Sequence, residues 1–159
     1  MKKYAFGVDI GGTTCKIGFF DTNGTLLDKW EIKTNTENNG ESILSDVAKA
    51  VDNKLAQEAI SKDDVQGIGI GVPGPVDSQG VVHRCVNLGW GVVNVAEELG
   101  NLTGLKIKVG NDANVAALGE MWQGGAKGSK DVIMVTLGTG VGGGIIVDGK
   151  VVAGFNGAG

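Results

Sequence analysis

Short apolar runs separated by glycine-rich turns dominate the first third of the chain. Residues 4–10 and 15–20 are two such runs, joined by residues 11–14, and a third run covers residues 26–33 after a turn at residues 23–24. Apolar runs of this length that end in turn residues are typical of β-strands, and short connections are typical of hairpins. We therefore expect an N-terminal β-hairpin followed by a third strand.

Helical periodicity begins at residue 41. Apolar residues recur at helical spacing through residues 41–60, which predicts an amphipathic helix. Residues 65–72 form an apolar run that is too short for a helix, so they predict a buried strand that ends at the Pro-Gly-Pro loop of residues 73–75. Further along, the pattern predicts helices at 94–102 and 111–123 and strands at 106–109, 132–137, 144–147 and from 151 onwards.

One pattern occurs twice in the chain. Residues 8–21 align without a gap on residues 135–148, and although few residues are identical, the apolar and glycine positions correspond. Each copy reads strand, glycine turn, strand, turn. This internal repeat suggests a duplicated domain whose second copy is only begun here.

The composition indicates a folded protein and argues against nucleic-acid and membrane partners. Hydrophobic residues make up 42% of the 159 residues and charged residues 20%, close to the globular average. The formal charge of −4 shows no excess of basic residues, which binding to nucleic acid or an anionic membrane would favour. No apolar stretch approaches the roughly 18 residues of a membrane span, and no signal peptide is found, so we expect a cytoplasmic protein.

The cysteine and histidine residues give no metal or disulfide pattern. Cys15 and Cys85 are far apart and show no CxxC spacing, so we expect reduced thiols. His83 is solitary in a predicted loop, where a solvated side chain is the simplest interpretation.

Glycine is the compositional outlier, and its placement points to phosphate binding. The 29 glycines make up about 18% of the chain, against roughly 7% on average. A strand that runs into consecutive small residues exposes backbone N–H groups, and such turns bind phosphate oxygens. Residues 11–14 fit this pattern, with Lys16 as a nearby cation, although an ordinary hairpin turn would look the same. A second glycine turn at residues 138–143 strengthens the phosphate interpretation.

Two other nucleotide-binding patterns fit less well. Gly138, Gly140 and Gly143 have the spacing of the Rossmann fingerprint, but that fingerprint needs a helix after the glycines, whereas residues 144–147 predict a strand. The chain contains no GxxxxGK[ST] run, so it has no P-loop of that type.

Polar side chains gather at residues 110–114, where a predicted strand ends and a helix begins. Asn or Asp at such a position is the preferred helix cap. One cap is enough, however, and this segment offers Asn111, Asp112 and Asn114 together. A carboxylate here could accept the proton of a sugar hydroxyl while asparagine side chains bind neighbouring hydroxyls. Both the capping and the sugar-binding interpretation remain open at this point.

Five segments together resemble bacterial glucokinases of the ROK family (repressors, open reading frames, kinases). They are residues 8–18, 69–77, 87–90, 111–114 and 137–144. The match covers nearly the whole chain in the family's order, and the Asn-Leu-Gly-Trp sequence at residues 87–90 is most similar to the glucokinase branch.

The resemblance implies an α/β fold of the actin-like ATPase (ribonuclease H-like) class. Residues 1–110 would form the N-terminal small domain and residues 111–159 the beginning of the large domain, with sugar and ATP in the cleft. The implied activity is ATP-dependent phosphorylation of glucose at its 6-hydroxyl. The alternatives are another hexose or an N-acetylhexosamine as substrate, or a noncatalytic sugar-responsive regulator. Regulators of this family carry an N-terminal helix-turn-helix, whereas here a predicted strand begins close to Met1.

The resemblance also assigns site residues. Asp112 matches the family's general base, which takes the proton from the sugar 6-hydroxyl. The residues on the sugar side are Gly71, Asn87, Asn111 and Asp112, and Asp9 lies near Mg²⁺. The phosphate-binding residues are Asp9, Gly11, Gly12, Thr13, Thr14 and Lys16 in the first segment, and Gly138, Thr139, Gly140, Gly142 and Gly143 in the second. The implied ligands are ATP with Mg²⁺ and glucose or a related hexose.

The family continues past Gly159 with further sugar-binding segments, a His and Cys zinc cluster and the adenine-binding part. A structural zinc is therefore expected in the full-length family, but its ligands are absent from this sequence. We expect the chain alone to be inactive, and to self-associate or be partly disordered beyond Gly124. The full-length protein is expected to be a homo-oligomer.

Overall fold

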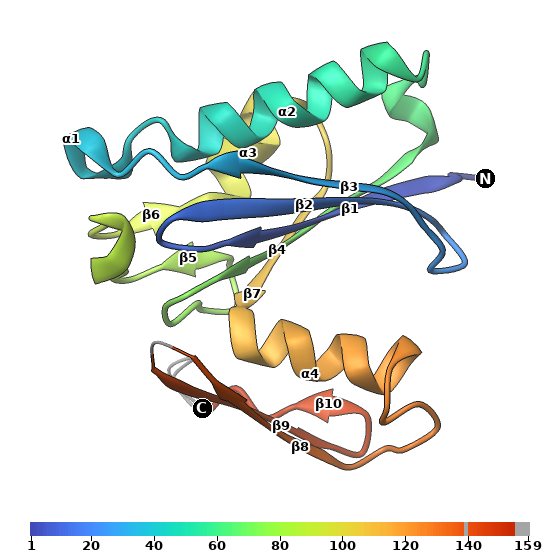
Figure 1. The fold of residues 1–159 in the computed structure, drawn as a ribbon, viewed down its shortest axis with the longest axis vertical. Coiled ribbons are helices and arrows are strands. Elements are labelled where there is room, and N and C mark those ends of the chain that lie inside the picture. The colour runs from blue at the N-terminus through green and yellow to red at the C-terminus, as the bar shows by residue number, and fades with distance from the viewer. Residues whose placement is uncertain (139, 155–159) are drawn as a thin grey trace.

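The computed structural model describes residues 1–138 and 140–154, and it contains two main sheets with a helix between them (Figure 1). The strands are β1 (Tyr4–Ile10), β2 (Thr14–Asp21), β3 (Leu26–Lys33), β4 (Val65–Val72), β5 (Val81–Val82), β6 (Val93–Asn94), β7 (Ile107–Asn111), β8 (Val132–Leu137), β9 (Val141–Val147) and β10 (Lys150–Val151). The helices are α1 (Glu37–Gly40), α2 (Ile43–Gln57), α3 (Val95–Thr103) and α4 (Asp112–Gln123), with 3₁₀ turns at Lys62–Asp64 and Val86–Leu88. The first sheet has the order β3-β2-β1-β4-β7 and the second the order β10-β9-β8.

β1 lies at the centre of the five-stranded sheet, with an antiparallel and a parallel neighbour. Val8 pairs with Ile17 of β2 in the antiparallel ladder and with Ile70 of β4 in the parallel one. Because alternate residues of a strand face opposite sides, Phe6, Val8 and Ile10 share one face, and all three are buried. α2 and α3 cover this face (Figure 1). The parallel strands β1, β4 and β7 end at a common edge of the sheet.

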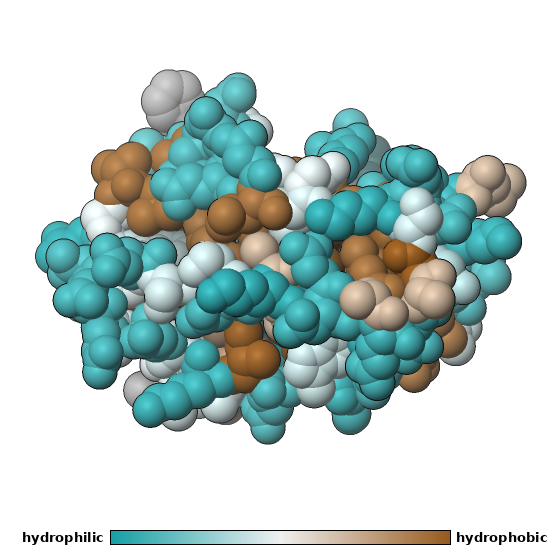
Figure 2. All heavy atoms as spheres, turned by 90° about the horizontal axis from the view of Figure 1, so that it is seen from above, coloured by the Kyte–Doolittle hydropathy of each residue, from teal (hydrophilic) through white to brown (hydrophobic). Residues whose placement is uncertain are grey.

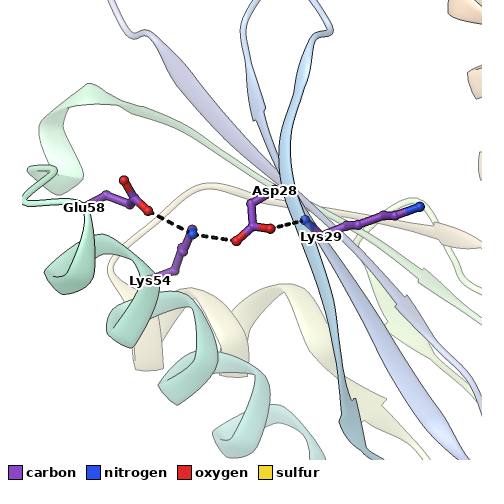
Figure 3. A network of polar contacts seen from close by, with 4 residues as sticks. All are labelled: Asp28, Lys29, Lys54 and Glu58. Atoms are coloured by element: carbon purple, nitrogen blue, oxygen red, sulfur yellow. Dashed lines mark hydrogen bonds and ion pairs between the residues drawn. The ribbon is translucent and has the colours of Figure 1, made fainter.

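α2 is amphipathic, as its periodicity predicts. Its buried apolar residues are Ile43, Leu44, Val47, Ala48, Val51 and Leu55. Lys54 is also buried, and it forms ion pairs with Asp28 of β3 at 2.6 Å and with Glu58 at 3.0 Å (Figure 3). Its Nζ lies 5.8 Å from the ring centroid of Phe19 and 5.6 Å from that of Trp30, within cation–π range. These contacts fix the last turns of α2 on β2 and β3.

The surface above α2 is mostly hydrophilic. Figure 2 looks down on this side of the molecule and shows hydrophilic residues over most of it, interrupted by small groups of apolar residues. Apolar residues scattered in this way are ordinary on folded proteins. None of the helices in the described part of the chain is long and apolar enough to cross a membrane.

α4 lies between the two sheets, and glycines allow it to approach both of them (Figure 1). A Cβ at Gly110 of β7 would lie 2.8 Å from Cγ2 of Val115. On the other side, a Cβ at Gly144 of β9 would lie 2.7 Å from Cβ of Ala117 and 2.8 Å from the carbonyl oxygen of Ala113. Protein interiors do not tolerate such short contacts. The helix therefore lies this close to both sheets because glycine stands at these two positions.

The structure confirms most of the predicted elements, with differences at several ends. The helix predicted at residues 41–60 ends at Gln57, because Ala59 adopts a left-handed conformation with φ of 54°. The strand predicted at residues 144–147 begins at Val141. The paired strands β5 and β6 were not predicted, because strands of two residues are too short to show periodicity.

Both copies of the internal repeat are hairpins, but their turns differ by one residue. Ile10 pairs with Cys15 across the first turn, and Leu137 pairs with Val141 across the second. Four residues therefore lie within the first turn and three within the second. Ile10 is buried in the core beneath α2 and α3, as are Phe6 and Val8. Leu137, its equivalent in the repeat, is 83% exposed, because no element in the described part of the chain covers that face of β8.

Candidate functional site

The carboxyl ends of the parallel strands and the start of α4 border a cavity of about 700 Å³. This edge is the common ligand-binding edge of open α/β sheets. The predicted site residues that line the cavity are Asn87, Asn111, Asp112, Gly138, Gly140, Gly142 and Gly143. The fold thus brings together the predicted general base, two predicted sugar-binding asparagines and the second glycine turn.

Asn111 caps α4 and ties it to the Pro-Gly-Pro loop. Its Oδ1 accepts a hydrogen bond from the N–H of Ala113 at 3.1 Å, and its Nδ2 donates to the carbonyl oxygen of Gly74 at 3.1 Å. The capping interpretation of this segment is therefore confirmed. One of the two Nδ2 hydrogens is used by Gly74, so the other is the group through which this amide could bind a ligand.

Asp112 is the first residue of α4, beside the Asn111 cap. Its Oδ1 accepts a hydrogen bond from the N–H of Ala113 at 2.8 Å, and a carboxylate at a helix N-terminus is favoured by the helix dipole. The N-terminus of α4 therefore holds this carboxylate at the cavity wall.

Asp9 and Asp112 both line a second, smaller cavity of about 330 Å³. Gly71 lies beside them, because a Cβ at this position would lie 3.4 Å from Cα of Asp112 and 3.9 Å from Oδ1 of Asp9. Gly71 therefore keeps the space next to the two carboxylates open. Thr136 lines both cavities, so they adjoin each other at the start of α4.

The electrostatic surroundings of Asp9 suit a cation. Burial raises the pKa of Asp9, the charge of Asp112 raises it further, and Lys16 lowers it. Lys16 pairs directly with Asp9 in the β1–β2 ladder. A carboxylate whose charge is disfavoured in this way gains from a divalent cation, and Mg²⁺ needs only one or two carboxylates when nucleotide phosphates supply its other ligands. In residues 1–138 and 140–154, no group of three or more His, Cys, Asp or Glu side chains could hold a metal.

The first glycine turn lies next to the segment that carries Asn87. The N–H of Gly11 donates to the carbonyl oxygen of Thr14 at 3.0 Å and closes the turn. A Cβ at Gly12 would lie 3.7 Å from the carbonyl oxygen of Asn87, which is an ordinary contact distance. Residues 11–14 themselves are outside the linings of the two cavities, so the structure places this turn beside the site.

The glycines of the second turn differ in their surroundings. The N–H of Gly138 donates to the carbonyl oxygen of Gly140 at 2.9 Å, and a Cβ at either position would meet nothing within 4 Å. A Cβ at Gly142 would instead lie 2.5 Å from Oγ1 of Thr136, so this glycine is required by packing. Gly143 lies opposite Val135 in the β8–β9 ladder. Thr139, also predicted to bind phosphate, lies outside the described residues.

Thr136 is a polar residue of this site that lies outside the sequence motifs. It lines both cavities, and the internal repeat aligns it with Asp9. This alignment could have identified Thr136 from the sequence, because the equivalent position in the first copy is the predicted functional residue Asp9.

Known proteins resemble this chain in sequence and in fold. The model of the ROK family matches residues 5–159. A glucokinase from Halalkalibacterium halodurans is 45% identical over 156 residues, which are 98% of this chain and 47% of that protein. A ROK family glucokinase from Streptomyces griseus, solved in complex with glucose and AMPPNP, has a TM-score of 0.84 at 37% identity and matches 97% of this chain and 47% of that one. A ROK hexokinase from Thermus thermophilus has a TM-score of 0.82 at 32% identity and matches 98% of this chain and 51% of that one.

These matches confirm the predicted fold class. The chain has the α/β architecture of the actin-like ATPases, as the ROK sugar kinases do. It spans about half the length of the relatives that it matches.

Proposed function

Because the chain belongs to the ROK family, we propose that it acts in an ATP-dependent kinase that phosphorylates glucose at the 6-hydroxyl. The observation that carries this proposal is the single cavity lined by Asp112, by Asn87 and Asn111, and by the glycine turn at Gly138 and Gly140. A carboxylate, two amides and a backbone turn are the groups that a sugar and a nucleotide phosphate require. The names of the two glucokinase relatives support glucose as the sugar.

Asp112 is the proposed general base. The glucose 6-hydroxyl oxygen attacks the γ-phosphorus of ATP, and its proton passes to the Asp112 carboxylate. The bond between the γ-phosphorus and the bridging oxygen breaks, and ADP leaves. The chain contributes mainly by positioning the two substrates and stabilising charge, as is usual in phosphoryl transfer.

The sugar side of the cavity is proposed to include Asn87, Asn111 and the space beside Gly71. The second Nδ2 hydrogen of Asn111, which has no acceptor among the described residues, can donate to a hydroxyl next to the reacting one. Asn87 approaches from the 3₁₀ turn Val86–Leu88, which Trp90 anchors through an Nε1–H hydrogen bond to the carbonyl oxygen of Gly40 at 3.0 Å. Hydroxyl recognition would thus come from two separate segments.

The phosphate side is proposed to include both glycine turns, Lys16 and Asp9. ATP enters with its Mg²⁺, which neutralises phosphate charge, and Asp9 is the residue of this chain that would contact the ion. Gly12 and Thr13 in the first turn and Gly140 in the second would supply backbone N–H donors, because the N–H groups of Gly11 and Gly138 already bond within their turns. A structural zinc ion and homo-oligomerisation are further proposals for a protein of the relatives' length.

We also assign residues 1–110 to a small domain and residues 111–159 to the start of a large one. The boundary lies just before Asn111, the last residue of β7, and α4 begins at the next residue, Asp112. The site would then lie at the junction of the two domains.

A coupled ADP-release assay tests the proposed reaction in a kinase of the relatives' length that carries this chain. The sugars are glucose, mannose, galactose, N-acetylglucosamine and N-acetylmannosamine, each supplied with ATP. Polyphosphate is tested separately through formation of the sugar phosphate, because its use releases no ADP. The expected result is the highest kcat/KM for ATP with glucose, with glucose 6-phosphate identified by NMR. Turnover that needs an N-acetylhexosamine, or ADP release that does not need sugar, would contradict the proposal.

A further inference from the structure

Thr34, the residue after β3, contacts the first glycine turn at two points. Its hydroxyl donates to the carbonyl oxygen of Gly11 at 2.7 Å, and its N–H donates to the carbonyl oxygen of Thr13 at 2.9 Å. Thr34 is only 5% exposed, so water does not compete well for these bonds. The sequence motifs gave no role to this residue.

The thiol of Cys15 completes a buried chain of hydrogen bonds. Its Sγ lies 3.3 Å from Oγ1 of Thr34. The single hydroxyl hydrogen of Thr34 is directed to Gly11, so the thiol is the donor in this contact. Burial raises the pKa of Cys15, which keeps the thiol protonated and able to donate. The Thr34 hydroxyl therefore accepts a hydrogen bond from the Cys15 thiol and donates one to the carbonyl oxygen of Gly11 in the turn.

The two bonds of Thr34 determine where the N–H groups of the turn point. In a trans peptide the carbonyl and the N–H of the next residue point in opposite directions. Because the Gly11 carbonyl points to Thr34, the N–H of Gly12 points away from it. Among the hydrogen bonds of the described residues, the N–H of Gly12 has no acceptor. This donor is thus both oriented and available.

We infer that Thr34 is a positioning residue for the first phosphate turn: it fixes the Gly11 and Thr13 carbonyls so that the Gly12 N–H is presented to a phosphate oxygen. The inference rests on the proposed function, because it takes the turn to be a phosphate site. Thr34 itself does not contact the ligand. Its contribution is to fix the turn before the phosphate arrives, which lowers the ordering cost of binding.

The test is a titration of this chain, labelled with ¹⁵N, with Mg²⁺–ATP and separately with inorganic triphosphate. In the unchanged chain the Gly12 amide signal is expected to shift with either ligand. Thr34→Val removes the hydroxyl at nearly constant shape, and the dissociation constant of triphosphate is expected to rise about threefold to tenfold, the range of one hydrogen bond. Thr34→Ser keeps the hydroxyl and should bind like the unchanged chain.

Thr103→Val is the matched control. Thr103 is as buried as Thr34, and its hydroxyl donates to the carbonyl oxygen of Leu99 at 2.8 Å in α3, away from the turn. Its loss should lower stability without changing triphosphate binding. Equal triphosphate affinity in Thr34→Val and the unchanged chain, or an equal loss in Thr34→Val and Thr103→Val, would overturn the inference.

Two further outcomes separate this inference from the proposed function. If triphosphate shifts no amide of residues 11–14 in the unchanged chain, the phosphate assignment of the turn is wrong, and the inference fails with it. If Thr34→Val does not fold, ¹⁵N relaxation of the unchanged chain decides. A pre-fixed turn gives a Gly12 order parameter near the ~0.85 of rigid backbone without ligand, whereas a mobile Gly12 that orders only with triphosphate would overturn the inference.

Discussion

At the scale of single residues, the glycines of the second hairpin serve two purposes. Gly138 and Gly140 stand in open space, where a backbone can approach a ligand. Gly142 and Gly144 face α4, and a Cβ at either would collide with Thr136 or with Ala113 and Ala117. One glycine-rich motif therefore combines a candidate binding turn with a packing requirement.

This difference predicts that two alanine substitutions affect stability to different extents. Gly144→Ala places a methyl group against α4 and should lower the free energy of unfolding by about 1–3 kcal/mol, as overpacking does. Gly140→Ala meets no neighbour and should change it by less than about 0.5 kcal/mol. Urea unfolding of this chain, followed by circular dichroism, measures both. Equal losses would show that α4 does not lie as close to β9 as described.

At the scale of elements, polar contacts and apolar burial together attach α2 to the sheet. Asp28 of β3 lies opposite Lys54 of α2, and Glu58 reaches the same ammonium group (Figure 3). The hydrogen bond from Lys54 lowers the pKa of Asp28, and the bond to Asp28 raises the pKa of Lys54.

These shifts predict how the stability of the helix contact depends on pH. Asp28 stabilises the fold above its unfolded pKa of about 3.9, and this contribution is lost as the pH falls through its lower folded pKa. Asp28→Asn should therefore have a lower Tm than the unchanged chain at pH 7, with the gap narrowing toward pH 2.5. Lys54 stays charged over this range, because its contribution is lost only above about pH 10.4. A Tm gap that does not change between pH 7 and 2.5 would exclude the ion pair as its cause.

The elements that the sequence predicts best are those with a local signal. The hairpin of β1 and β2 has two apolar runs and a glycine turn, and α2 has helical spacing over four turns. β5 and β6 lack such a signal because they pair over only two residues each, across the intervening residues 83–92. The position of α4 between two sheets depends on glycines in β7 and β9, whose contacts are nonlocal.

At the scale of the whole molecule, the second sheet has one face on α4 and one exposed apolar face. The exposed residues are Ile133, Val135, Leu137, Val141, Ile145 and Val147. A sheet that is apolar on both faces is usually covered on both. An uncovered face of this kind favours association.

We expect this chain to self-associate through that face in a concentration-dependent way. Ile133→Lys, at a residue that is 77% exposed, should shift the sedimentation coefficient toward that of the monomer. Val92→Lys is the matched control, because Val92 is 72% exposed but lies outside the sheet. If both variants reduce association equally, the sheet face is not the contact surface.

The candidate site could be predicted in part. The motif residues Asn87, Asn111 and Asp112 line one cavity with the second glycine turn, because the ends of parallel strands meet at one edge. Thr136 and Thr34 were not predicted as functional. The position of Thr136 depends on the contact of α4 with the second sheet, and that of Thr34 on its hydrogen bonds to a turn about twenty residues away. Such placements follow from tertiary contacts that no local pattern specifies.

The measurement that bears most directly on the proposed reaction is the turnover of Asp112→Asn in a kinase of the relatives' length that carries this chain. The amide keeps the shape of the carboxylate but cannot accept the proton, so kcat should fall about 10²-fold to 10⁴-fold. Glucose affinity, measured separately by calorimetry, should change by no more than about threefold. Asp63→Asn, at an exposed position in the 3₁₀ turn Lys62–Asp64, should leave both values unchanged. If the Asp112→Asn enzyme keeps more than about half of the kcat of the unsubstituted enzyme, the assignment of Asp112 as the general base is contradicted.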